Sequence, residues 1–105
     1  MERNKLIMQI NIINSYRYVV AICDSDLLGK VFEEEKFQLD VKESFYKGKE
    51  VSQEEAIEMM KDMQKEDATF NIIGKEATKA ALKAGIIEKE GIGTIQGIPF
   101  ALVLT

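Results

Sequence analysis

The stretch SQEEAIEMMKDMQKEDATFNIIGKEATKAALKAG, residues 52–85, predicts a helix, a strand and a second helix in succession. In its first part, Ser52 and Glu55 form the S-x-x-E pattern of a capping box, in which each side chain binds a backbone N–H of the other residue. Four apolar side chains then recur at helical spacing, namely Ala56, Met59, Met60 and Met63. We therefore predict a helix over residues 52–66 with one face in the core.

The second part of the stretch predicts the strand and the second helix. The run TFNII, residues 69–73, is rich in residues that favour strands. A helix follows over residues 75–84, with four alanines on one side, namely Ala77, Ala80, Ala81 and Ala84. Gly85 stands where a helix commonly ends in a left-handed residue.

The segments that flank this stretch predict further strands. In the N-terminal run 6–13 apolar and polar residues alternate, and the run 16–23 is rich in β-branched and aromatic residues. Asn14-Ser15 between them predicts a hairpin turn. Two more strands are expected at 37–41 and 44–51, with a glycine turn at Gly48, whereas the acidic run 33–36 predicts a solvated turn. Near the C-terminus, Pro99 predicts a bend, because proline lacks a ladder donor, and a final strand follows at 100–104.

Together these elements predict an α+β domain with two layers. We expect a mostly antiparallel sheet with an N-terminal hairpin, packed by the helices 52–66 and 75–84. The chain has 105 residues, which fits a single domain spanning residues 1–105. A domain of this size buries one modest core.

Composition excludes several classes of enzyme. The chain contains no histidine and a single cysteine, Cys23, so it cannot build a Ser–His–Asp or Cys–His arrangement, a Cys/His zinc cluster or an internal disulfide. We expect no cofactor. The formal net charge is −4, which argues against a protein that coats nucleic acid indiscriminately but leaves room for a local basic contact.

Two further features bear on localisation. The N-terminal run MERNKLIMQINIINS lacks the small-residue cleavage site of a signal peptide, and Gln9 and Asn11 interrupt its apolar part. No uninterrupted run of apolar residues is long enough to span a membrane. We therefore expect a cytoplasmic protein, a location that also suits a single unpaired cysteine.

The junction Gly74-Lys75 allows two interpretations. A helix N-terminus offers free N–H groups and a partial positive charge, so Gly74 and Lys75 could form a small anion pocket. The sequence has one glycine here, fewer than either a P-loop or a dinucleotide-binding turn requires. The other interpretation is that Gly74 only turns the chain from strand into helix.

The lysines of the second helix form a more informative pattern. Lys75, Lys79 and Lys83 recur every four residues, so they form one row opposite the alanine side. Leu82 lies beside this row. Such a surface suits contact with a phosphate backbone or an acidic protein, or else it is a solvated face with Leu82 covered by the following loop.

The run FYKGKE, residues 45–50, interleaves aromatic and basic side chains. Tyr46 together with Lys47 and Lys49 predicts a nucleic-acid contact, because rings can stack on bases while lysines meet phosphates. The alternative is a strand with aromatic residues in the core. Asp24 and Asp26 in CDSD, residues 23–26, offer a weak magnesium site, although helix capping explains them equally well.

Several of these pieces also carry a family resemblance. They are CDSDLLGK (23–30), FYKGKE (45–50), NIIGKEA (71–77), AGII (84–87) and IQGIPFA (95–101). On these residues the chain resembles the small archaeal proteins of domain of unknown function family 424, over nearly its whole length. In that family the last piece often carries a histidine after the proline, where this chain has Phe100. The resemblance implies a cytoplasmic archaeal protein and a companion of the translation machinery.

The patterns and the resemblance together predict a non-catalytic binding module. We expect it to contact RNA or a ribonucleoprotein through Lys75, Lys79, Lys83 and Leu82, with Tyr46, Lys47 and Lys49 nearby. One alternative is a small phosphate- or nucleotide-binding protein or enzyme that uses Gly74 and Lys75, with Asp24 or Asp26 as acid or metal ligand. Another is a protein–protein adaptor or homodimer that pairs through the edge of strand 100–104.

Overall fold

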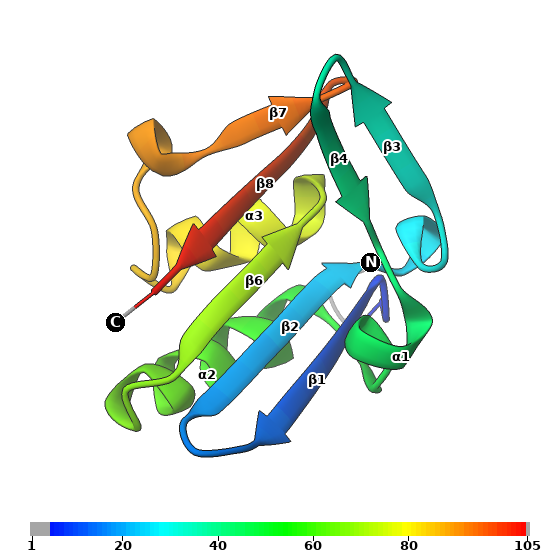
Figure 1. The fold of residues 1–105 in the computed structure, drawn as a ribbon. Coiled ribbons are helices and arrows are strands. Elements are labelled where there is room, and N and C mark those ends of the chain that lie inside the picture. Colours follow the sequence, from blue (N-terminus) through cyan, green and yellow to red (C-terminus); the bar gives the residue numbers. More distant parts are fainter. Residues whose placement is uncertain (1–4, 105) are drawn as a thin grey trace.

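One twisted six-stranded sheet organises the chain in the computed structural model, which describes residues 5–104 (Figure 1). Its strands, in spatial order, are β5 (Lys49–Val51), β1 (Met8–Asn14), β2 (Tyr18–Asp24), β6 (Thr69–Ile73), β8 (Ile98–Val103) and β7 (Gly93–Ile95). The pairing of β2 with β6 is parallel and every other neighbouring pair is antiparallel. The predicted α+β class with a mostly antiparallel sheet is therefore confirmed.

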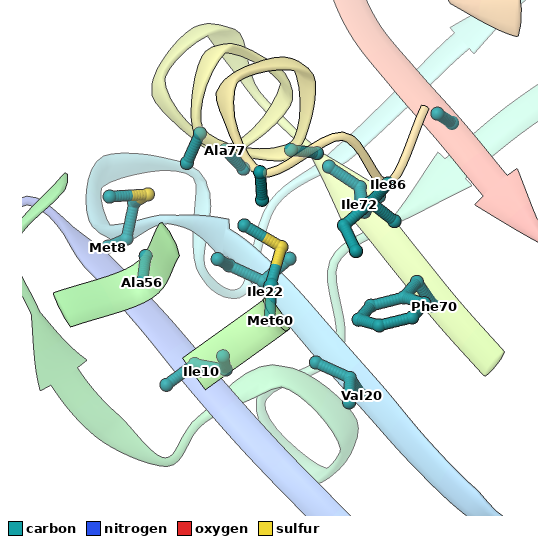
Figure 2. Packing of buried hydrophobic residues seen from close by; sticks show 14 of the residues in the cluster. Met8, Ile10, Val20, Ile22, Ala56, Met60, Phe70, Ile72, Ala77 and Ile86 are labelled. Carbon is teal, nitrogen blue, oxygen red and sulfur yellow. The ribbon is translucent and has the colours of Figure 1, made fainter. Parts of the chain in front are cut away.

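Two helices cover one face of the sheet. They are α2 (Gln53–Lys65) and α3 (Lys75–Lys83), which match the predicted helices 52–66 and 75–84. Side chains at alternate strand positions point toward them, among them Ile10, Ile22 and Phe70, and these pack with Met60 of α2 (Figure 2). The small alanines of α3 complete this cluster, so the larger of the two cores lies between sheet and helices.

The opposite face of the sheet carries a smaller layer. A separate hairpin, β3 (Val31–Glu34) and β4 (Phe37–Asp40), lies over it together with the short helix α1 (Glu43–Tyr46). Strand residues of the other parity, Cys23 and Ile73, pack there against Leu39 and Tyr46. The two-layer description thus holds for the sheet with its helices, and a third, partial layer adds a second core.

Polar side chains of β1 hold the end of α1 and the residues before β5 in place. Gln9 Oε1 accepts a hydrogen bond from the Gly48 N–H at 3.1 Å, and Asn11 Nδ2 donates to the Phe45 carbonyl at 2.8 Å. Gln9 and Asn11 interrupt an otherwise apolar strand. Their amides satisfy backbone groups of a neighbouring segment, which is the usual requirement for polar groups at buried or half-buried positions.

Several local predictions are corrected by the structure. The predicted strand 44–51 is wrong, because residues 43–46 form α1 and only Lys49–Val51 pair with β1. The predicted turn 33–36 is wrong in its first half, because Glu33 and Glu34 belong to β3. The first hairpin turns at residues 15–17 rather than at Asn14-Ser15, since Asn14 pairs with Tyr18.

The last strand also differs from the prediction. Pro99 lies inside β8 and not at a bend before it. It sits opposite Thr94 of β7, a three-residue strand at the edge of the sheet, where the missing N–H removes little pairing. Strand β7 pairs with β8 over Ile98–Phe100, so it covers only Phe100 of the dimer edge predicted at 100–104. Only its second half extends past β7, and Leu102 is 57% exposed there.

Residues 1–4 and Thr105 lie outside the described part of the chain. They include the start of the segment considered for a signal peptide and the two ends of the predicted domain 1–105. Among the helices within residues 5–104, none combines the length and the apolar character needed to cross a membrane.

Candidate functional site

The end of β2 and the beginning of α3 are joined by the carboxylate of Asp24. Its Oδ1 accepts a hydrogen bond from the Ala77 N–H at 2.8 Å, and its Oδ2 accepts one from the Glu76 N–H at 3.1 Å. These are first-turn N–H groups of α3, which have no partner within the helix. Asp24 therefore caps a helix that begins far along the chain, at Lys75.

Gly74 makes this close approach feasible. Its φ of 118° lies in the region that side-chain-bearing residues rarely adopt, and a Cβ placed on it would overlap the Asp24 carboxylate. Its N–H donates to the Pro99 carbonyl at 2.8 Å. Gly74 is thus a structural residue. The anion pocket predicted from Gly74 and Lys75 is wrong in its main element, because the protein's own carboxylate already occupies the amides of Glu76 and Ala77.

Burial dominates the electrostatics of Asp24. Its side chain is almost entirely enclosed, and this burial raises the pKa of Asp24 above its ordinary value, although the hydrogen bonds from Glu76 and Ala77 act in the opposite direction. The nearby carboxylates of Asp26 and Glu76 raise it further. Both oxygens of this carboxylate are engaged at the start of α3.

A cleft opens beside this junction. It has a volume of about 670 Å³ and lies outside the carboxyl end of β2, where the first turns of α2 and α3 also meet. Its lining comprises Lys5, Leu6, Ile7, Asp24, Ser25, Asp26, Gln53, Lys75 and Glu76. The structure thus brings together Asp24, Asp26 and Lys75 from the sequence predictions, in a cleft rather than in a glycine turn.

Gln53 ties the two helices together at this cleft. Its Nε2 donates to the Glu76 carbonyl at 2.7 Å and to Glu76 Oε1 at 3.1 Å. Its Oε1 and the Oγ of Ser25 are buried and have no hydrogen-bond partner among the residues described. Sequence reasoning missed Lys5 and Gln53, which belong to no recognisable motif, and it passed over Ser25 in favour of its neighbours Asp24 and Asp26 in CDSD.

A metal site at Asp24 and Asp26 finds no support in the structure. Within residues 5–104, no three Cys, Asp or Glu side chains gather closely enough to hold a metal ion. Both oxygens of Asp24 are occupied by backbone donors, while Asp26 is exposed. Asp24 does cap a helix, but that helix is α3 and not the short turn directly after Asp24, where its side chain forms no cap hydrogen bond.

The lysine row lies on the outer side of α3. Lys75, Lys79, Lys83 and Leu82 are all exposed, and Leu82 keeps 39% of its surface accessible. None of the three lysines forms an ion pair with a carboxylate in the described part of the chain. Because α3 rises 1.5 Å per residue, the row is about 12 Å long.

The run 45–50 is arranged differently from the predicted aromatic and basic contact. Tyr46 keeps only 6% of its surface and lies in the smaller core, where its ring meets that of Phe45 edge to face at 5.0 Å. Burial also raises the pKa of Tyr46 to about 12. Tyr46 is therefore unable to stack on a base, which corrects its predicted role.

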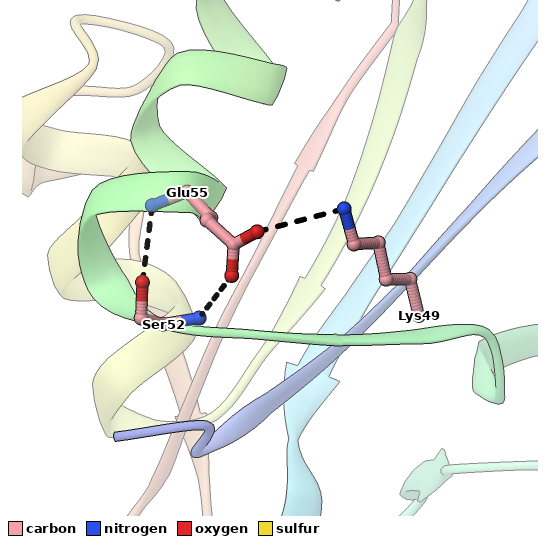
Figure 3. A network of polar contacts seen from close by, with 3 residues as sticks. All are labelled: Lys49, Ser52 and Glu55. Atoms are coloured by element: carbon pink, nitrogen blue, oxygen red, sulfur yellow. Dashed lines mark hydrogen bonds and ion pairs between the residues drawn. The ribbon is translucent and has the colours of Figure 1, made fainter. Parts of the chain in front are cut away.

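The two lysines of that run remain on the surface. Lys47 is exposed, and Lys49 forms an ion pair with Glu55 Oε2 at 3.5 Å (Figure 3). Glu55 is also the distal member of the predicted capping box, whose two hydrogen bonds with Ser52 are both present. Lys49 thus lies next to the helix cap of α2 and has a partner within the chain.

Comparison with known proteins now places the chain. A family model described as protein of unknown function (DUF424) matches residues 13–105. The chain belongs to the DUF424 family. This confirms the resemblance seen in the sequence, and the match includes Asp24, Gly74 and the whole lysine row. A comparison with curated proteins finds no match.

A solved structure shares the fold of this DUF424 chain. It is the crystal structure of an uncharacterized conserved protein from Methanopyrus kandleri, with a TM-score of 0.83 and 26% identical residues. The alignment covers 91% of this chain and 89% of the other. The solved structure therefore supports the architecture described above for this DUF424 chain.

Nucleophilic chemistry is disfavoured at the one thiol. Cys23 is fully buried, and this burial, followed by the charges of Asp24 and Asp26, raises the pKa of Cys23 to about 12. The thiolate is the reactive form, so a thiol in this environment is inert near neutral pH. Cys23 serves as a core residue of the smaller cluster.

Proposed function

We propose that this DUF424 protein is a non-catalytic module that binds RNA, free or within a ribonucleoprotein, through the outer face of α3. The observation that carries the proposal is the row of Lys75, Lys79 and Lys83, which is exposed and free of ion pairs within residues 5–104. Ammonium groups in a row on a rigid helix suit repeated contact with a phosphate backbone.

The surroundings of the row support this choice. The whole chain is acidic, with a formal net charge of −4, so a local row of three positive charges stands out from the average. Leu82 adds an exposed apolar contact beside the lysines. The family resemblance, which implies an association with the translation machinery, points to the same class of partner. A cytoplasmic location is part of this proposal.

The proposal is tested by the salt dependence of RNA binding. Each lysine–phosphate contact contributes a slope of roughly 0.7 to 0.9 in log affinity against log salt. Three contacts therefore predict a loss of about 20- to 40-fold in affinity between 50 and 200 mM salt. Fluorescence anisotropy with a labelled structured RNA measures this loss. Undetectable binding at the lower salt concentration would contradict the proposal.

A triple variant identifies the face. Lys75, Lys79 and Lys83 are replaced together by glutamine, and we expect weaker RNA binding and a salt slope lower by about two to three. The fold should remain intact because exposed charges contribute little stability each. The matched control replaces Lys30, Lys36 and Lys42, three exposed lysines elsewhere on the surface, and should keep the affinity. Equal behaviour of the two variants would show that the row on α3 is only a solvated surface.

A further inference from the structure

The cleft beside Asp24 is a second candidate site, separate from the outer end of the lysine row. Its volume of about 670 Å³ falls in the range of small-molecule sites, roughly 300–1,000 Å³. It lies outside the carboxyl end of β2, whose neighbour β6 runs parallel and leads directly into α3. In sheets with parallel strands, ligands commonly bind at this position.

Charges of both signs line the cleft. Lys5 and Lys75 contribute two ammonium groups, and Asp26 and Glu76 contribute two carboxylates. Asp24 adds a third carboxylate, and each of its oxygens already accepts a hydrogen bond from a backbone N–H group. Because ammonium groups and carboxylates both line it, this cleft suits a ligand that carries one charge of each sign. Leu6 and Ile7 form an apolar part of the wall.

Two polar atoms in the lining also lack partners. The Oγ of Ser25 and the Oε1 of Gln53 are buried, and neither makes a hydrogen bond with any residue that the structure describes. A buried polar atom without a partner costs free energy that a suitable ligand recovers on binding. Gln53 Oε1 can only accept, so it requires a donor such as an amine, whereas the hydroxyl of Ser25 can donate to an anion.

We propose that the cleft binds a small zwitterion of the amino-acid class, with its ammonium group toward Asp26 and Gln53 and its carboxylate toward Lys5 and Ser25. A phosphate group matches the cleft less well. The amides that would bind it at the start of α3 are taken by Asp24, and a second negative charge would face the carboxylates of Asp26 and Glu76.

The test is a titration of the ¹⁵N-labelled protein followed by NMR. The probes are glycine and leucine, compared with acetate, methylammonium and inorganic phosphate. We expect the two zwitterions to cause saturable shifts at the amides of Ser25, Asp26 and Gln53. Acetate and methylammonium should bind about tenfold more weakly or less, because each makes only half of the contacts. Two results would overturn the proposal. One is that phosphate alone causes shifts. The other is that neither zwitterion causes a saturable shift up to about 50 mM, the limit set by the weakest useful affinities.

Charge-matched variants separate the cleft from general surface effects. Lys5→Gln and Asp26→Asn should each weaken zwitterion binding about tenfold, the usual effect of removing one charged partner. Lys30→Gln and Asp62→Asn make the same changes at exposed positions outside the cleft and should leave binding unchanged. Equal loss in the control variants would contradict the assignment. Neither Lys5 nor Asp26 belongs to the proposed RNA face, so the two proposals can fail independently.

Discussion

At the scale of single residues, Asp24 and Gly74 act as a pair. The carboxylate caps α3 from the end of a strand, and the glycine removes the side chain that would block it. A ligand-binding glycine turn and this arrangement look alike in sequence, since both place one glycine between a strand and a helix. The two differ in how much the glycine contributes to the stability of the fold, because here the glycine packs against an internal carboxylate.

Gly74→Ala is therefore expected to destabilise the protein by about 2–4 kcal/mol. A left-handed conformation costs other residues about 1–2 kcal/mol, and forcing a methyl group against Asp24 adds a similar amount. Urea denaturation measures the change. Gly91→Ala is the control, since nothing lies within 4 Å of the added carbon there, and it should change stability by about 0.5 kcal/mol or less. A Gly74→Ala variant as stable as wild type but defective in binding would restore the anion-pocket interpretation.

The raised pKa of Asp24 predicts how stability depends on pH. Because the pKa is raised in the folded state above its ordinary value of 3.8, the folded protein takes up the proton at a higher pH than the unfolded chain does. The resulting stability is fully present below 3.8 and is lost as the pH rises through the raised value. Relative to Asp24→Asn, which does not titrate here, wild type should therefore gain stability as the pH falls from 7 toward 4.

Chemical denaturation of both proteins at several pH values measures this difference. Titration of carboxylates distant from Asp24 is common to wild type and Asp24→Asn, so it cancels in the comparison. A difference that stays constant with pH, or one that changes in favour of Asp24→Asn on acidification, would show that burial does not control this carboxyl.

At the scale of elements, α2 is fixed by its own sequence. The Ser52 hydroxyl accepts from the Glu55 N–H and the Glu55 carboxylate accepts from the Ser52 N–H, both at 3.3 Å. The same carboxylate meets Lys49 on the surface. The cap satisfies buried backbone groups, whereas the ion pair is exposed to water, so the two interactions should differ in strength.

Ser52→Ala should lower the free energy of unfolding by about 1 kcal/mol, the typical cost of losing a serine cap. Lys49→Gln should cost about 0.5 kcal/mol or less because exposed ion pairs are screened by solvent. Thermal melting of the two variants at one salt concentration compares them directly. A larger loss in Lys49→Gln than in Ser52→Ala would mean that the surface pair, and not the cap, holds the start of α2.

At the scale of the whole molecule, stability comes from the core between the sheet and the two helices. Phe70 of β6 is 1% exposed within this core, whereas Phe37 at the start of β4 is 67% exposed. Replacing either residue with alanine removes the same phenyl ring. Their comparison therefore isolates the contribution of burial.

Phe70→Ala is expected to cost about 3–5 kcal/mol through lost burial and the cavity it leaves. Phe37→Ala should change stability by about 0.5 kcal/mol or less, as at most exposed positions. Urea denaturation of both variants provides the measurement. Similar costs for the two substitutions would indicate that Phe37 is covered in solution, for example by a partner of the β3–β4 hairpin.

The sequence alone determined the elements whose signals are local. The helix over 52–66 follows from its cap and its apolar spacing, and the strand 69–73 and the alanine-faced helix follow from short runs of their own. The exposure of Lys75, Lys79 and Lys83 also follows from helical spacing, since the alanines on the other side must face the sheet. Each of these signals lies within a few residues of the structure that it predicts.

The tertiary structure decided the features that depend on which distant segments meet. The parallel pairing of β2 with β6 brings Asp24 to the start of α3, which turns an apparent metal or anion ligand into a helix cap. The sequence predicts an exposed ring at Tyr46, but in the folded chain this ring lies in the smaller core on the second face of the sheet. The cleft likewise joins residues from four segments. No local pattern predicts these contacts, because burial and hydrogen bonding depend on the neighbours that a residue acquires only when the whole chain has folded.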